Sequence, residues 1–118
     1  MAPSSSAHPY PRAARVNQIL REVISDVLVR MADTDEQLGM LTVTGVETSP
    51  DMRTAVVFFD SLSEEARAEL EERRRELQAA VNAQTRLKRT PRLSFQADPA
   101  VARGNAVEEI LRRHHERD

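Results

Sequence analysis

Apolar residues recur along residues 15–31, RVNQILREVISDVLVRM, at the spacing of one helix face, and polar residues such as Asn17 and Glu22 occupy the opposite face. Val and Ile are only moderate helix formers, so packing must hold this segment in place. The pattern predicts an amphipathic helix that packs on a sheet. Its apolar stripe comprises Val16, Ile19, Leu20, Val23, Ile24, Val27, Leu28 and Met31.

Two runs of strand-forming residues follow the helix. The segment LGMLTVTGVETS, residues 38–49, is rich in β-branched side chains, and RTAVVFFDS, residues 53–61, is apolar throughout its middle. The residues SPDM between them include Pro50, which fixes φ, and Asp51, which can bond its own backbone. The pattern predicts a hairpin whose second strand is central in a sheet. Phe58 and Phe59 are then interpreted as core residues in preference to base-stacking aromatics.

A second helix is predicted over residues 61–81, SLSEEARAELEERRRELQAAV. Two caps fit its start: Ser61 with Glu64 as a capping box, or Ser63 with acids in the first turn. The apolar stripe is interrupted at position 73 by three consecutive arginines, although a long arginine stem can pack while its guanidinium reaches water. The stripe comprises Ala66, Leu70, Leu77, Ala80 and Val81.

The third strand begins after Pro91 and alternates, with Leu93, Phe95 and Ala97 on one face and Arg92, Ser94 and Gln96 on the other. The order helix, strand, strand, helix, strand predicts an α+β fold in which a three-stranded sheet packs against helices. A short closing helix is expected in NAVEEILRRHH, where Val107, Ile110 and Leu111 form the apolar side.

Charge is distributed unevenly along the chain, although the formal net charge is only -2. Residues 32–72 carry two Lys or Arg against eleven acids, whereas residues 73–118 carry eleven against six. Local potential attracts phosphate, so the near-neutral total is compatible with a face that binds a polyanion. The alternative interpretation is that these charges are solvated helix faces.

The cations that follow the second helix suggest where such a face lies. Three of them occupy the connection to the third strand, and Arg92 takes the first outward position of that strand. Two more arginines begin the first helix, where the helix dipole disfavours cations, which hints at an external partner. The candidate RNA-binding residues are Arg12, Arg15, Arg73, Arg74, Arg75, Arg86, Lys88, Arg89 and Arg92.

The sequence lacks the residues that several kinds of catalytic, metal-binding or phosphate-binding site would need. Without cysteine there is no disulfide, thiolate zinc site or cysteine nucleophile. His114 and His115 are adjacent and cannot share a helix face, Glu108 and Glu109 are read as surface charge, and ARGNA is too poor in glycine for a phosphate loop. We therefore expect a non-enzyme with no metal or cofactor. With no signal-peptide or membrane-spanning pattern, a cytoplasmic location is expected.

Three segments resemble the signature blocks of the ribosome-binding factor A family of bacterial small-subunit assembly factors. They are RVNQILREVISDVL, LGMLTVTGVETSPDMRTAVVFFDSL and TPRLSFQADPAVARGNAVEEIL, and the resemblance spans roughly residues 12–111. The most specific element is the hairpin with its Ser-Pro-Asp turn, and the spacing of Pro91, Leu93, Phe95 and Asp98 provides a second anchor.

The resemblance implies a type II KH-like domain, in which an interrupted helix pair with an Ala-x-Gly motif replaces the usual GxxG loop. Here Arg73 to Arg75 stand where that motif is expected. The kink is then absent, shifted toward QAAVNAQ, or made by other residues. An arginine cluster at that place still attracts phosphate. The implied organisation is a flexible arm at residues 1–11, the KH-like domain at residues 12–111 and a polar tail at residues 112–118.

The resemblance also implies a function. The chain is expected to act as a monomer that binds immature small (30S) ribosomal subunits and their 16S rRNA, assists late maturation and 5′-end processing, supports growth in the cold, and catalyses nothing. The acidic segment from Asp33 to Glu72 is expected to repel phosphate from the far face. Two alternatives stay open: a small α+β regulatory domain that binds a metabolite or dimerises, and a nuclease or RNA-modifying enzyme suggested only by the basic residues.

Overall fold

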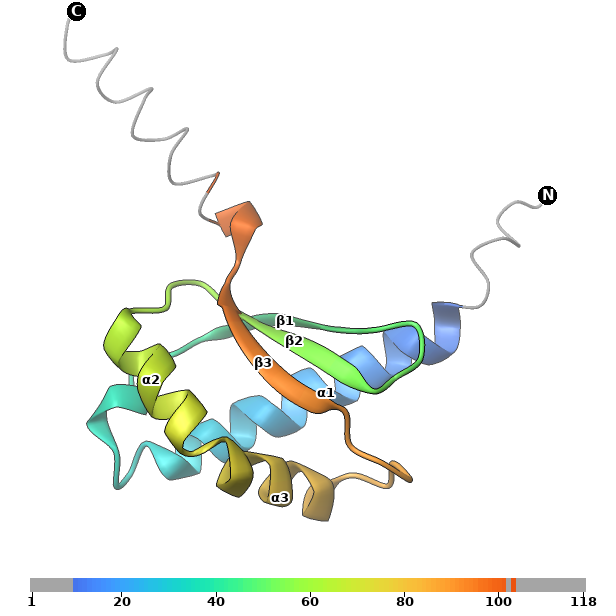
Figure 1. Ribbon diagram of the computed structural model, residues 1–118, viewed down its shortest axis with the longest axis horizontal. Helices are drawn as coiled ribbons and strands as arrows, with labels where there is room; N and C mark the ends of the chain where they lie inside the picture. The colour runs from blue at the N-terminus through green and yellow to red at the C-terminus, as the bar shows by residue number, and fades with distance from the viewer. Residues whose placement is uncertain (1–9, 102, 104–118) are drawn as a thin grey trace, which may run out of the picture.

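The computed structural model describes residues 10–101 and residue 103. Figure 1 shows a three-stranded sheet with helices beside it, in the element order helix, strand, strand, helix, helix, strand. The elements are α1 (Tyr10–Met31), the short 3₁₀ helix η2 (Glu36–Leu38), β1 (Val43–Thr48), β2 (Thr54–Phe59), α2 (Glu64–Glu72), α3 (Arg74–Gln84) and β3 (Arg92–Ala97). The predicted α+β class is confirmed.

Helix α1 carries the apolar stripe that the sequence predicts and begins at Tyr10, ahead of Arg12 and Arg15, which the sequence places at its start. Six of the eight stripe residues are buried, Val23 is partly buried, and Ile19 lies at the edge of the stripe with 37% exposure. Asn17, on the polar side, accepts hydrogen bonds from the backbone N–H and hydroxyl of Thr48 at 3.1 and 2.9 Å. This contact fixes α1 against the end of β1.

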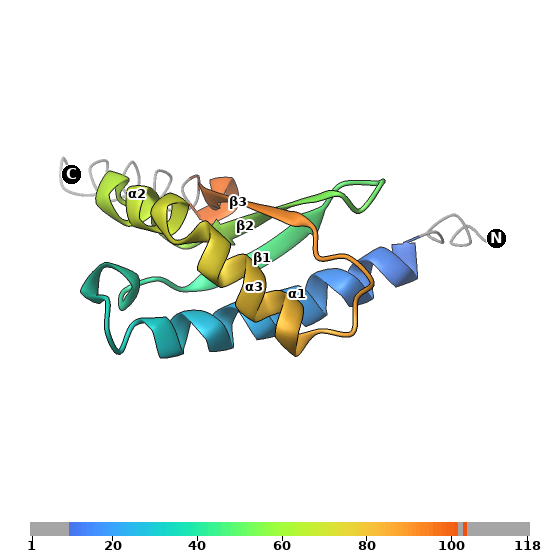
Figure 2. The same ribbon diagram turned by 60° about the horizontal axis from the view of Figure 1, so that its bottom comes forward.

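The sheet has the order β1-β2-β3, so β2 is central, as its continuous apolar run predicts. Strand β2 pairs antiparallel with β1 and parallel with β3. Figure 2 shows α1 and α3 on one side of the sheet. The side chains that face the helices are buried, and the rings of Phe59 and Phe95 lie 6.3 Å apart in the core. The core interpretation of Phe59 is therefore correct, whereas Phe58, one residue earlier in the strand, is only partly buried.

The alternation predicted for β3 holds for most of the strand. Leu93 and Phe95 are buried, while Arg92, Ser94 and Gln96 are exposed. Ala97 is exposed as well, against the prediction that it points into the core. The strand ends at this residue, and the backbone N–H of Asp98 donates to the carbonyl of Phe59 at 2.7 Å.

The second helix predicted from the sequence is two helices that meet at Arg73. Ser63, not Ser61, caps α2, because its hydroxyl accepts a hydrogen bond from the N–H of Ala66 at 3.1 Å. Arg73 has φ -101° and ψ 14°, which departs from helical geometry and separates α2 from α3. The kink therefore exists without Ala-x-Gly and is centred on Arg73.

Some expectations fall outside the described residues. The predicted closing helix around Val107, Ile110 and Leu111 is among them, as are His114, His115 and most of both terminal segments. In the described part of the chain, no helix is both long and apolar enough to span a membrane.

Candidate nucleic-acid interface

A groove of about 980 Å³ lies between the α2–α3 break, the β1–β2 turn and the start of β3. Its most distinctive feature is a set of five arginines from three separate parts of the chain. The polar side chains of Gln78 and Thr90 and two glutamates complete the lining. We call this surface the arginine groove; its arginines are Arg53, Arg74, Arg75, Arg89 and Arg92.

Arg53 reaches the groove because of the conformation of the β1–β2 turn. The carboxylate of Asp51 accepts hydrogen bonds from the Ser49 hydroxyl at 2.6 Å and from the Arg53 N–H at 3.1 Å. These bonds lower the pKa of Asp51, the hydroxyl having the larger effect. Met52 adopts a φ of 63°, an uncommon value for a non-glycine residue, and so turns the chain back into β2. The carbonyl of Arg53 then accepts the N–H of Arg92 at 2.8 Å, which places Arg53, just before β2, beside the first residue of β3.

Gln78 joins the helical wall of the groove to β3. Its Nε2 donates to the carbonyl of Pro91 at 2.6 Å, and its Oε1 accepts from the N–H of Leu93 at 3.2 Å. Because the N–H of Arg92 points toward β2, these two backbone groups lie on the opposite edge of β3. One glutamine thus links α3, which begins with Arg74 and Arg75, to the strand that begins with Arg92.

Two acids share the groove with the arginines. Glu71 pairs with Arg74, with Oε1 and Nη2 3.3 Å apart, and Glu72 also lines the wall. The acidic segment is therefore not confined to a far face, since part of it lies within the basic surface itself. Five guanidinium groups against two carboxylates still leave the groove strongly cationic, as phosphate binding requires.

The structure brings together only part of the set predicted from the sequence. Arg74, Arg75, Arg89 and Arg92 line the arginine groove. Arg86 and Lys88 are exposed on the same α3–β3 connection, and Arg12 and Arg15 are exposed near the start of α1, but these four are not among the described residues that line it. For them RNA binding stays a prediction.

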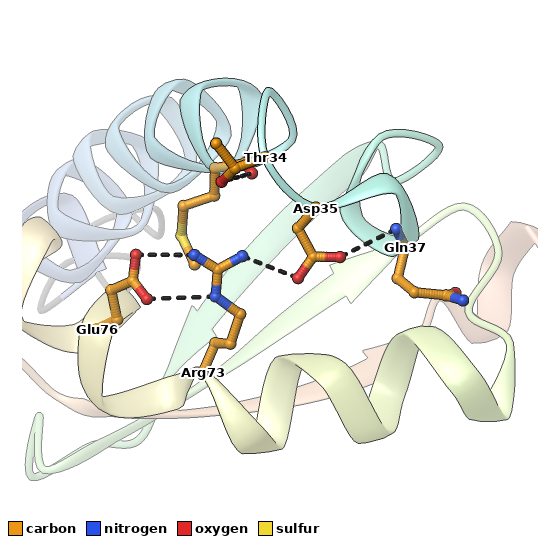
Figure 3. A network of polar contacts seen from close by, with 6 residues as sticks. Thr34, Asp35, Gln37, Arg73 and Glu76 are labelled. Atoms are coloured by element: carbon orange, nitrogen blue, oxygen red, sulfur yellow. Dashed lines mark hydrogen bonds and ion pairs between the residues drawn. The ribbon is translucent and has the colours of Figure 1, made fainter.

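Arg73 contacts two acidic side chains of the same chain, as Figure 3 shows. Its guanidinium donates to Asp35 through Nη1 at 2.8 Å and to both carboxylate oxygens of Glu76 at 3.2 and 2.9 Å. Its side chain is only 19% exposed. Two carboxylates of this chain occupy its guanidinium, and RNA binding by Arg73 stays a prediction.

The carboxylate of Asp35 is held by several groups at once. Its second oxygen accepts the N–H of Gln37 at 3.1 Å and so caps η2. Hydrogen bonds from the Glu69 carboxyl and from Arg73 lower the pKa of Asp35. The same carboxyl–carboxylate contact, together with burial, raises the pKa of Glu69. We call the group Asp35, Arg73 and Glu76 the Arg73 clamp.

Sequence reasoning missed three residues that shape this region. Arg53 stands alone between a turn and a strand, and only the backbone hydrogen bond from the N–H of Arg92 to its carbonyl places it beside Arg92. Gln78 and Asp35 carry no motif, and their partners lie 13 and 38 residues away. In the part of the chain that the structure describes, no group of three or more His, Cys, Asp or Glu side chains could hold a metal ion.

A three-stranded sheet with helices on one face and a broken helix pair before the last strand defines a KH-like α+β domain, here with an arginine-lined groove at the break. The model of the family described as ribosome-binding factor A matches residues 12–111. The chain belongs to the ribosome-binding factor A family.

Relatives and solved structures agree with this assignment. The ribosome-binding factor A of Rubrobacter xylanophilus is 42% identical over 105 residues, covering 86% of this chain and 85% of the relative, and that of an Anaeromyxobacter species is 33% identical, covering 92% and 93%. The crystal structure of ribosome-binding factor A from Thermus thermophilus has a TM-score of 0.63 at 30% identity, covering 72% of this chain and 94% of the other. A homology model of the Thermus thermophilus factor, fitted into a cryo-EM map of a 30S complex, has a TM-score of 0.57 at 30% identity, covering 69% and 89%.

Proposed function

We propose that this protein binds immature small (30S) ribosomal subunits, contacts their rRNA through the arginine groove, and assists late maturation and 5′-end processing without catalysing a reaction. The observation that carries the proposal is the convergence of five arginines from the β1–β2 turn, the α2–α3 break and the β3 start on one groove. Family membership supports the ribosomal partner, as does the Thermus thermophilus factor fitted into a 30S complex.

The chemistry of the groove favours recognition of backbone over bases. Guanidinium groups bind phosphate oxygens in pairs, and five of them on one surface can follow a folded RNA strand. Two of the three phenylalanines, Phe59 and Phe95, are buried in the core, so little aromatic surface is left for stacking. RNA shape and phosphate position then govern binding.

The mechanism we propose is differential stabilisation. A protein that binds one conformer of rRNA more tightly than another shifts the particle toward that conformer and leaves when maturation changes the site. Action as a cytoplasmic monomer that supports growth at low temperature is part of the same proposal.

Sedimentation with purified immature and mature small subunits, at two salt concentrations, tests the proposal. The tagged protein is expected to sediment preferentially with immature particles, and less so at the higher salt, because phosphate contacts release counterions. An Arg75, Arg89, Arg92 triple alanine variant removes three exposed cations of the groove. A matched Arg21, Arg30, Arg67 triple alanine variant removes the same charge elsewhere.

The proposal predicts that the groove variant loses subunit binding and that the matched variant keeps most of it. Equal losses would mean that total charge, not the groove, drives association. If the unchanged protein does not bind subunits at either salt concentration, the proposed function is wrong. An increase in the thermal stability of the protein on adding a small molecule would favour the metabolite-binding alternative.

A further inference from the structure

The break between α2 and α3 is made at an arginine, a residue with good intrinsic helix propensity. Backbone hydrogen bonds continue on both sides of it: the N–H of Arg73 donates to the carbonyl of Glu69 at 2.9 Å, and the N–H of Leu77 donates to the carbonyl of Arg73 at 3.0 Å. The residue itself has φ -101° and ψ 14°. Nothing in the preferences of arginine requires this bend, so tertiary contacts must impose it.

The side chains that contact Arg73 come from two elements, η2 and α3. Asp35, at the N-terminus of η2, binds one side of the Arg73 guanidinium, and Glu76, in the first turn of α3, binds the other side with both oxygens. The Asp35 side chain is 10% exposed and that of Arg73 is 19% exposed, so solvent screens their pair less than a surface pair. The Arg73 clamp therefore ties the loop after α1 to the break (Figure 3).

The two residues after the break are the ones that the arginine groove uses. Arg74 and Arg75 begin α3 and line the groove, so the direction in which the chain leaves Arg73 decides where their side chains lie. Arg73 itself is not among the residues that line the groove, and three of its five N–H donors are occupied by carboxylates of the same chain.

We propose that Arg73 is a positioning residue: with Asp35 and Glu76 it fixes the bend between α2 and α3 and thereby directs Arg74 and Arg75 into the arginine groove. Asp35 is then part of the RNA-binding apparatus, although it is acidic and binds no RNA. This inference rests on the proposed function where it concerns RNA, and on the clamp geometry alone where it concerns the bend.

The Asp35→Asn variant distinguishes positioning from direct contact, because the two roles predict opposite signs. If Arg73 were an RNA ligand restrained by Asp35, the variant would release a cation and remove an anion, and affinity for a small-subunit rRNA fragment would rise. If Arg73 positions the groove, affinity falls by about tenfold, the equivalent of roughly one charge-assisted contact. Asp33→Asn, an exposed acid two residues away, removes the same charge and serves as the matched control.

A double-mutant cycle with Arg73→Ala sharpens the test. The positioning role predicts that Arg73→Ala and Asp35→Asn each weaken binding and that the double variant is no weaker than the worse single one, because both disrupt one clamp. Arg73→Lys, which cannot bind both carboxylates in a fork, is expected to rescue only part of the affinity. Additive losses, or an affinity of Asp35→Asn equal to or above that of the unchanged protein, would overturn the proposal.

The bend itself can be measured without RNA. The chain has no cysteine, so spin labels at Ala68→Cys in α2 and Ala79→Cys in α3, both exposed, report one distance across the break. We expect a narrow distance distribution in the otherwise unchanged protein and a broad or shifted one when Asp35→Asn or Arg73→Ala is added, with thermal unfolding checking that each variant folds. An unchanged distribution in the folded variants would overturn the clamp even if RNA binding is normal. If the proposed function is wrong and the clamp is right, the unchanged protein will not bind rRNA, but the distance between the spin labels will still change when Asp35→Asn or Arg73→Ala is added.

Discussion

Gln78 and Pro91 lie 13 residues apart in the chain and are joined by a hydrogen bond of 2.6 Å from the side-chain amide to the backbone carbonyl. The same amide group accepts the N–H of Leu93 at 3.2 Å, so a single side chain satisfies two backbone groups on the outer edge of β3. It occupies the position that a neighbouring strand would take. This contact connects the helix that carries Arg74 and Arg75 to the strand that begins with Arg92.

Replacing Gln78 by alanine is expected to lower the free energy of unfolding by about 1–3 kcal/mol, because two backbone groups lose their partner. Urea unfolding measures this loss, and affinity for small-subunit rRNA is expected to fall with it. Gln84→Ala, an exposed glutamine at the end of the same helix, provides the control and is expected to change either quantity little. Equal effects of the two substitutions would show that the bridge to β3 contributes nothing.

The N-cap of α2 allows a second prediction, because both Ser61 and Ser63 fit the N-cap position in the sequence and the structure selects Ser63. Ser63→Ala removes the acceptor for the Ala66 N–H and should cost about 1 kcal/mol of stability. Ser61→Ala removes no cap and should stay within about 0.5 kcal/mol of the unchanged protein. Thermal unfolding of the two variants checks the assignment, and a larger loss from Ser61→Ala would reverse it.

The contact between Glu69 and Asp35 predicts a pH-dependent effect. The pKa of Glu69 is raised, first by its hydrogen bond with Asp35 and then by burial. Protonated Glu69 therefore stabilises the fold below its unfolded-state pKa, and this stabilisation is lost as pH rises through its folded-state pKa. Glu69→Gln keeps a neutral donor at every pH. The variant should therefore have a higher Tm than the unchanged protein at pH 7.5, and the difference should shrink toward pH 4.

The control for this experiment is Glu65→Gln, in the first turn of the same helix. Its negative charge there complements the helix dipole, so its removal should bring no gain in Tm at pH 7.5. If Glu69→Gln lowered Tm at pH 7.5, or raised it equally at both pH values, the carboxyl–carboxylate contact would not be the cause.

Glu71 and Glu72 lie within the arginine groove, and their charge opposes phosphate there. Replacing both with glutamine should raise affinity for unrelated RNA by about threefold to tenfold at low salt, because two repulsive charges are removed and Arg74 is released from Glu71. The same change at Glu64 and Glu65, outside the groove, should raise it less. Filter binding with a random RNA measures both, and equal gains would assign the effect to net charge alone.

The sequence predicts elements whose information is local. The stripe of α1, the hairpin with its Ser-Pro-Asp turn and the alternation of β3 each follow from residues within about 20 positions of one another. The interruption at Arg73 was also visible as a break in periodicity. Its meaning was not, because Asp35, which holds the bend, lies 38 residues away and carries no signal of its own.

The groove shows the same limit. The basic run at residues 86–92 identifies the region of the groove. Only the fold shows that Arg89 and Arg92 line the groove, whereas Arg86 and Lys88 are not among the described residues that line it. Arg53 joins Arg89 and Arg92 because its carbonyl accepts the N–H of Arg92, a contact that composition and spacing cannot reveal. The three consecutive arginines are divided in the same way: Arg74 and Arg75 line the groove, and Arg73 belongs to the Arg73 clamp.

The central claim, that the arginine groove faces rRNA, is tested most directly by hydroxyl radicals generated at defined positions of the bound protein. Because the chain has no cysteine, an iron chelate can be attached at Thr90→Cys, in the groove, or at Met40→Cys, which is 86% exposed and outside the residues that line the groove. Each labelled protein is bound to immature small subunits and rRNA cleavage is mapped. We predict strong cleavage in one confined region of the rRNA from Thr90 and weak cleavage from Met40. Strong cleavage from Met40 with none from Thr90 would contradict the account and move the interface to another face.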